Sequence, residues 1–146
     1  MRFRYSFQKI VDLKNTEKTQ AEWVLSGAVG RLREEEESLT SLRSEKENVQ
    51  WAMCRSAEQA VPVSELMAYQ HYVAHLEHRI ERKCEDVLYA ERVVVQKREA
   101  LSSKMMEEKV WSQAREKAFR QFQAEMLKKE QEELDEIAVV RFKQMS

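Results

Sequence analysis

The stretch Ser56-Ala57-Glu58-Gln59-Ala60-Val61-Pro62-Val63-Ser64 decides the fold, because it contains the only proline among 146 residues. A proline disfavours helical dihedrals in the residue before it and donates no backbone hydrogen bond, so a helix arriving from the amino end should stop here. On either side there is little from which to build loops, since the chain has two glycines and 35% of its residues are charged. We therefore predict an all-α chain whose two long helices form an antiparallel coiled-coil hairpin.

The position of this turn sets the expected boundaries. Helix one should cover about residues 2–57, the hinge about 58–63 and helix two about 64–144, in a single elongated unit of residues 1–146.

Both helices carry a seam, in which apolar residues recur at alternating spacings of three and four, as at the a and d positions of a coiled coil. In helix one the seam comprises Leu25, Ala28, Leu32, Glu35, Leu39, Leu42, Lys46, Val49 and Met53. In helix two it is clearest at a spacing of seven, in Leu66, Val73, Ile80, Val87, Val94 and Leu101. Charged residues within a seam cost stability and set register, so we expect marginal stability in isolation.

The composition excludes several classes of protein. A formal net charge of -1 argues against a dedicated nucleic-acid binder, which would carry a basic excess. No apolar run approaches the ~20 residues that span a bilayer, and the amino end lacks the pattern of a signal peptide. A cytoplasmic location is expected, with Cys54 and Cys84 too far apart along the hairpin to form a disulfide.

Motifs for catalysis are missing from the sequence, which contains no glycine-rich phosphate loop and no nucleophile elbow. His71, His75 and His78 share one helix face and could bind a transition metal, but they lie outside the seam. We interpret them as solvated surface histidines, with a metal site as the alternative. The expectation is a protein that is no enzyme and has no cofactor and no metal.

The unequal lengths of the helices indicate a binding partner. Helix one offers about 55 residues and helix two about 80, roughly 80 and 120 Å at ~1.5 Å per residue. Phe7 should lie opposite Trp111 to Arg115, leaving the chain uncovered from about Phe119 onward. Uncovered apolar residues at helical spacing usually mark a binding surface, and we favour this over a frayed end. They are Phe119, Phe122, Met126, Leu127, Leu134, Ile137, Val140 and Phe142.

Three stretches, in this order and spacing, together resemble the flagellar export protein FliJ family over essentially the whole chain. The first is Phe3-Arg4-Tyr5-Ser6-Phe7-Gln8-Lys9-Ile10-Val11-Asp12-Leu13-Lys14. The second, after the hinge, is Tyr69-Gln70-His71-Tyr72-Val73-Ala74-His75-Leu76-Glu77-His78-Arg79-Ile80. The third is Gln131-Glu132-Glu133-Leu134-Asp135-Glu136-Ile137-Ala138.

The resemblance implies a two-helix stalk similar to that of the F-type ATP synthase gamma subunit. Both chain ends would enter the hole of a hexameric flagellar export ATPase and promote its assembly and activity. The region after the hinge would meet the membrane export gate, and export chaperones are further possible partners. The chain would then be peripheral at the cytoplasmic face of the cell membrane, held there only through partners.

The resemblance also implies roles in partner binding for particular residues. Gate contacts would be Tyr72, Leu76, Arg79 and Lys83, so that replacing Tyr72 and Leu76 by Ala should leave the hairpin helical. The ATPase end would comprise Phe3, Phe7, Ile10, Phe119, Phe122, Leu134, Asp135, Glu136 and Ile137.

Two other interpretations stay open. The chain could be a structural coiled-coil adaptor that homodimerises through its seam, whereas a stalk should be a monomeric hairpin when free. It could also be the equivalent stalk of a non-flagellar type III secretion system, which only the partner would distinguish.

Overall fold

The computed structural model describes residues 2–145, which form two helices, α1 (Gln8–Glu58) and α2 (Val63–Met145). The helices pack against each other and no strand occurs among the described residues, so the all-α, two-helix prediction is confirmed. The chain divides into two compact units, each built from both helices. We call Ala21–Leu101 the hinge unit, and Met1–Gln20 with Ser102–Ser146 the terminal unit.

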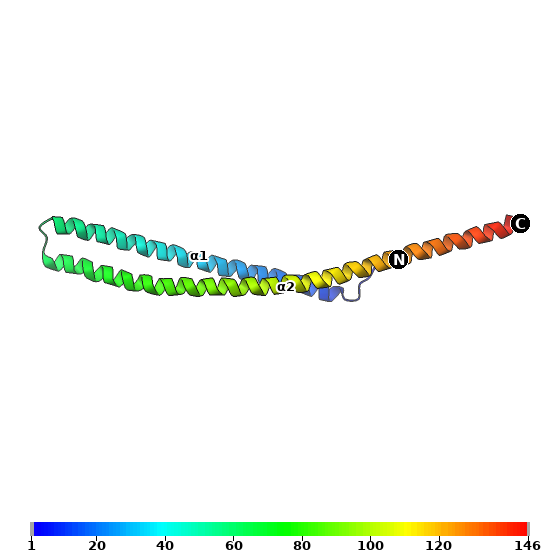
Figure 1. Cartoon of the computed structure of the whole chain (residues 1–146), viewed down its shortest axis with the longest axis horizontal. Helices are drawn as coiled ribbons and strands as arrows, with labels where there is room; N and C mark the ends of the chain where they lie inside the picture. Colours follow the sequence, from blue (N-terminus) through cyan, green and yellow to red (C-terminus); the bar gives the residue numbers. More distant parts are fainter. Residues whose placement is uncertain (1, 146) are drawn as a thin grey trace. The chain divides into compact units, whose positions relative to one another are not determined.

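In the hinge unit, α1 and α2 lie side by side and are joined by residues 59–62 (Figure 1). Their direction is antiparallel, because Glu35 binds Lys83 whereas Lys46, further along α1, binds Glu77. Helix α2 begins at Val63, directly after Pro62, whose carbonyl oxygen accepts the Glu65 amide at 3.1 Å. The single proline therefore ends one helix and precedes the next, as the sequence indicates.

The core of the hinge unit is the predicted seam. All nine seam positions from Leu25 to Met53 are buried or half-buried, and so are the six at a spacing of seven in α2. The most deeply buried side chain is that of Leu76, with no exposed area. Burying such an aliphatic side chain stabilises a fold by about 1.5–3 kcal/mol, so this narrow interface holds the hairpin closed.

In the terminal unit, α1 begins at Gln8 rather than near residue 2, and residues 2–7 form a non-helical N-terminal arm. The arm places the Phe3 ring 5.1 Å from that of Phe119 and 5.3 Å from that of Phe122. Residues 6 and 7 form a turn in which the Gln8 amide donates to the Tyr5 carbonyl at 3.1 Å, and residues 2–5 have no regular secondary structure. Aromatic packing at the end of the arm stabilises this non-helical conformation. Leaving the helix costs few hydrogen bonds, because the first amides of a helix have no partner within the helix.

Where α1 begins, ion pairs replace apolar seam contacts within the terminal unit. Lys14 binds Glu107 at 3.2 Å, Lys104 binds Glu17 at 3.3 Å and Lys18 binds Glu108 at 3.8 Å. The hydrogen bond from Lys14 to Glu107 is the main cause that lowers the pKa of Glu107. The bond to Glu17 is the main cause that raises the pKa of Lys104. This stretch thus combines these ion pairs with the buried side chain of Val11.

The carboxyl end of α2 buries none of its described side chains within the terminal unit. Every described residue from 127 to 145 is exposed, and Figure 1 shows this part of α2 (orange to red) continuing past the arm. We call residues 127–145 the free helix. The expectation that the uncovered stretch begins at Phe119 was wrong, because Phe3 packs on both Phe119 and Phe122.

Within residues 2–145, neither helix has a stretch that is both long and apolar enough to cross a membrane.

Candidate partner-binding surfaces

Tyr72 lies on the surface of the hinge unit, where α2 presents it beside α1. Its side chain is 41% exposed, and its hydroxyl donates a hydrogen bond to a carboxylate oxygen of Glu45. That bond is the main cause that raises the pKa of the Tyr72 hydroxyl. The ring stacks on His75 one turn later, with centroids 6.3 Å apart. The result is a fixed aromatic face with one side open to a partner.

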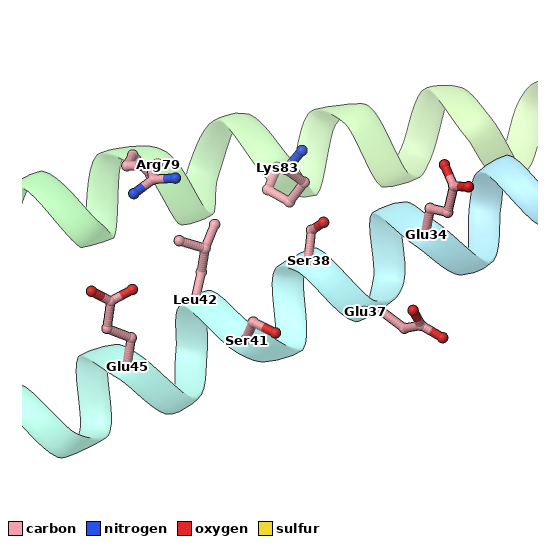
Figure 2. Close-up of a pocket in the computed structure, with 8 residues that line it drawn as sticks. All are labelled: Glu34, Glu37, Ser38, Ser41, Leu42, Glu45, Arg79 and Lys83. Atoms are coloured by element: carbon pink, nitrogen blue, oxygen red, sulfur yellow. The ribbon is translucent and has the colours of Figure 1, made fainter.

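A groove of about 570 Å³ runs beside Tyr72 between α1 and α2. Figure 2 shows its wall on α1, which comprises Glu34, Glu37, Ser38, Ser41, Leu42 and Glu45. Arg79 and Lys83 line the groove from α2. One wall is therefore rich in carboxylates and hydroxyls and the other is cationic, so the groove can bind charged side chains of a partner.

The four residues that the resemblance assigns to the gate do not form one surface. Tyr72 and Arg79 are exposed, whereas Leu76 is fully buried in the seam. Lys83 is half-buried, with Glu35 at 2.9 Å and Asp86 at 3.6 Å. A heptad seam places Leu76 three residues after Val73, on the side facing α1, so its side chain is unavailable for docking in the closed hairpin.

Glu35 is the one buried charged residue found in the described part of the chain, with 6% of its area exposed. It binds Lys83 of α2 and also Arg31, one turn earlier on α1, each at 2.9 Å. The hydrogen bond from Lys83 is the main cause that lowers the pKa of Glu35, and the same bond raises the pKa of Lys83. The pair fixes the register of the two helices, a known use of charged seam residues.

The pair predicts how stability depends on pH. A carboxyl group whose pKa falls on folding stabilises the protein at pH values above its ordinary pKa of 4.5. That stabilisation is lost as the pH falls through the pKa of the folded state. A lysine whose pKa rises on folding stabilises the protein at pH values below its ordinary pKa of 10.5. That stabilisation is lost as the pH rises through the pKa of the folded state. Thermal unfolding followed by circular dichroism should thus give a broad plateau with an acid and an alkaline limb.

The test of this pair is Glu35→Gln, with Glu36→Gln as the control. Glu36 is exposed and takes part in no ion pair among residues 2–145. Glu35→Gln should lower the melting temperature at neutral pH and flatten the acid limb, whereas Glu36→Gln should do neither. Identical acid limbs in all three proteins would refute the assigned role of Glu35.

The residues assigned to the ATPase end lie in two groups within the terminal unit. Phe3, Phe119 and Phe122 pack together, Phe7 lies 6.1 Å from Trp111 between ring centroids, and Ile10 is half-buried. The Arg115 guanidinium lies 6.0 Å from the Phe3 ring and donates a hydrogen bond to Gln8 at 2.6 Å. The aromatic group is thus a packed cluster in which Phe7 and Phe119 stay partly exposed.

The second group lies on the free helix. Leu134 and Ile137 are 60% and 53% exposed, and Asp135 and Glu136 are exposed beside them. Leu134 is 12 residues beyond Phe122, about 18 Å along a helix, so no contact joins the two groups.

The histidines and cysteines form no site among the described residues. His71, His75 and His78 are all exposed, and no cluster of metal-ligating side chains in residues 2–145 could hold an ion. Cys54 and Cys84 are both free thiols, and Cys84 accepts a weak hydrogen bond from Arg43 at 3.8 Å.

Sequence reasoning overlooked Glu45 and His75 as the residues that fix Tyr72. The helical spacing of three between Tyr72 and His75 could have indicated the stacking. The bond to Glu45 could not be foreseen, because it depends on the register between the two helices.

Comparison with known proteins gives one family from the sequence and a similar fold from a solved structure. The family model for the flagellar FliJ protein matches residues 3–145. The flagellar FliJ protein of Bacillus subtilis (strain 168) is 29% identical over 142 residues, which cover 97% of each chain. The solved structure of a YscO homologue from Chlamydia trachomatis superposes with a TM-score of 0.72 at 19% identity, covering 95% of this chain and 94% of that one. At that identity, the structural match supports the fold alone.

Proposed function

This chain belongs to the flagellar FliJ protein family, and we propose from this that it is a non-enzymatic stalk of the flagellar type III export apparatus. In this role it inserts into the hexameric export ATPase, promotes assembly and activity of the hexamer, and links it to the membrane export gate. Its place is then the cytoplasmic face of the membrane, where partners hold it.

The exposure of the free helix carries this proposal. Five large apolar side chains there, Leu134, Ile137, Val139, Val140 and Phe142, are each more than half exposed. Exposed apolar residues crowded on one segment usually mark an interaction site, and a monomer gains nothing from ordering them in water. We propose that the ATPase covers this segment in the assembly.

The aromatic cluster of the terminal unit supports a second contact with the same partner. The arm and α2 meet there, and Phe7 and Phe119 are still 49% and 38% exposed. Rigid aromatic side chains make strong interface anchors at low entropic cost. We propose that the rim of the ATPase hexamer rests on this cluster.

For the export gate we propose a contact through Tyr72 and Arg79. Both side chains are exposed. Arg79 lines the groove, and Tyr72 is held in place beside it by its hydrogen bond to Glu45 and its stacking on His75. Leu76 supports this surface from below rather than forming part of it, because it has no exposed area.

Hydrogen exchange, measured for the free chain and for its complex with the cognate export ATPase, tests the proposal. In the free chain, amides of residues 127–145 should exchange much faster than those of the hinge-unit core, because all of these residues are exposed. In the complex, protection should rise most in residues 127–145 and next in the aromatic cluster. Protection confined to residues 69–80 would contradict the proposal, since the ATPase would then hold the hinge unit.

A further inference from the structure

Four charged side chains of the terminal unit form a closed ring between α1 and α2. Lys14 binds Glu107 at 3.2 Å and Glu17 at 3.6 Å. Lys104 binds the same two carboxylates, Glu107 at 3.6 Å and Glu17 at 3.3 Å. The charges alternate around the ring, so every member has two neighbours of opposite sign. We call Lys14, Glu17, Lys104 and Glu107 the charge ring.

The charge ring lies where a coiled coil normally packs apolar side chains. The seam spacing of three and four runs on α1 from Val11 through Lys14 to Lys18, and on α2 from Lys104 to Glu108. Lys18 and Glu108 bind each other at 3.8 Å. Charged residues at seam positions specify the register of two helices and lower the stability of their pairing. This part of the seam therefore supplies register more than strength.

The terminal unit buries little apolar area to hold its helices together. Among its described residues, Val11 is the one buried side chain. The hinge unit, in contrast, buries Leu39, Leu42, Val73, Leu76, Val87, Ala90 and Val94. The side chains of the charge ring are between 24% and 42% exposed, so salt screens their attraction. A region with few buried contacts opens more easily than a packed core.

We propose that the terminal unit opens as a separate cooperative unit while the hinge unit stays closed, and that the charge ring sets how often it opens. On opening, the arm and residues 8–20 of α1 leave α2 together. A helical segment this short is marginal in water without tertiary contacts, so its backbone hydrogen bonds break as well. This opening needs no partner, so it goes beyond the proposed function and does not depend on it.

Opening also changes the surface that the terminal unit presents. In the closed form, Phe3 packs on Phe119 and Phe122, and Phe7 lies beside Trp111. Detachment of the arm exposes the α2 side of this aromatic cluster. Salt does not weaken apolar packing, so the aromatic contacts favour the closed form without making it sensitive to salt. A salt response of the terminal unit thus reports on its ion pairs.

Hydrogen exchange of the free, full-length chain measures this opening, with rates taken relative to an unfolded peptide of the same sequence. Amides of residues 9–20 and 104–118 should exchange at least about tenfold faster than those of residues 73–94 in the hinge unit. Both terminal segments should speed up together by about threefold between ~0.1 M and ~1 M sodium chloride, and residues 73–94 by less. Equal protection of the two units, or a terminal unit indifferent to salt, would overturn the proposal.

The variant that tests the charge ring exchanges its two members on α1, Lys14→Glu with Glu17→Lys. The net charge and the pair within α1 are kept, but a carboxylate now faces Glu107 and an ammonium group faces Lys104. Because attraction between the helices becomes repulsion, exchange of residues 9–20 should rise at least about fivefold at ~0.1 M salt. More salt should now slow this exchange, since screening weakens repulsion as well as attraction.

The matched control adds the reciprocal exchange on α2, Lys104→Glu with Glu107→Lys, to the α1 variant. All four signs are then reversed and the charges alternate again, so exchange of residues 9–20 should return to within about twofold of the wild type and regain its original salt response. Unchanged protection of residues 73–94 shows that each variant is folded. If the fourfold variant opens as readily as the α1 variant, alternation of charge does not hold the terminal unit closed and the inference fails.

Discussion

Replacing Leu76 with Ala is expected to lower the free energy of unfolding by about 3 kcal/mol, the effect typical of a fully buried leucine. Leu76 has no exposed area and lies in the seam of the hinge unit, where Leu42 also points from α1 toward α2 (Figure 2). Removing its side chain leaves a cavity that two helices cannot easily collapse around. Urea unfolding followed by circular dichroism measures the loss.

Tyr72→Ala is the matched comparison, one turn away on the same helix. Because Tyr72 is 41% exposed, its replacement should cost far less stability while it weakens binding to the export gate. The resemblance alone assigns both residues to the docking surface. A Leu76→Ala variant as stable as the wild type would return Leu76 to that surface and contradict its burial in the seam.

Deleting residues 127–145 is expected to leave the melting temperature within a few degrees of the wild type and to abolish the effect on the ATPase. No residue of this segment is buried, so its removal takes away no core. A milder variant, Leu134→Ser with Ile137→Ser, should weaken ATPase binding at least tenfold, because exposed apolar anchors dominate such contacts.

Leu88→Ser with Val95→Ser provides the control for that variant. These apolar residues are each 52% exposed and lie on α2 within the hinge unit, away from the free helix. Equal losses of binding in the two double variants would mean that general surface hydrophobicity, rather than the free helix, attracts the partner.

The seam and the turn could be predicted from the sequence because both are local patterns. Pro62 stops a helix whatever surrounds it, and residues spaced by three and four share one side of a helix wherever it packs. The same periodicity also places charged Glu35 and Lys83 at seam positions, where the structure pairs them.

The arm and the true extent of the uncovered surface could not be predicted in this way. Phe3, Tyr5 and Phe7 alternate in the sequence, but their leaving the helix depends on aromatic partners more than 100 residues away, such as Phe119. Helix length arithmetic treats residues 2–7 as helical, so it missed the non-helical arm. Family resemblance likewise assigned Leu76 to the gate contact but said nothing of the direction of its side chain. That direction depends on the register of α1 against α2.

The most direct test of the account is the ATP hydrolysis rate of the cognate flagellar export ATPase, measured alone, with the full chain and with the chain lacking residues 127–145. The account predicts clear stimulation by the full chain, and none by the shortened chain even though it remains folded. Equal stimulation by both chains would contradict the claim that the free helix is the working end, and no stimulation by either would contradict the stalk itself.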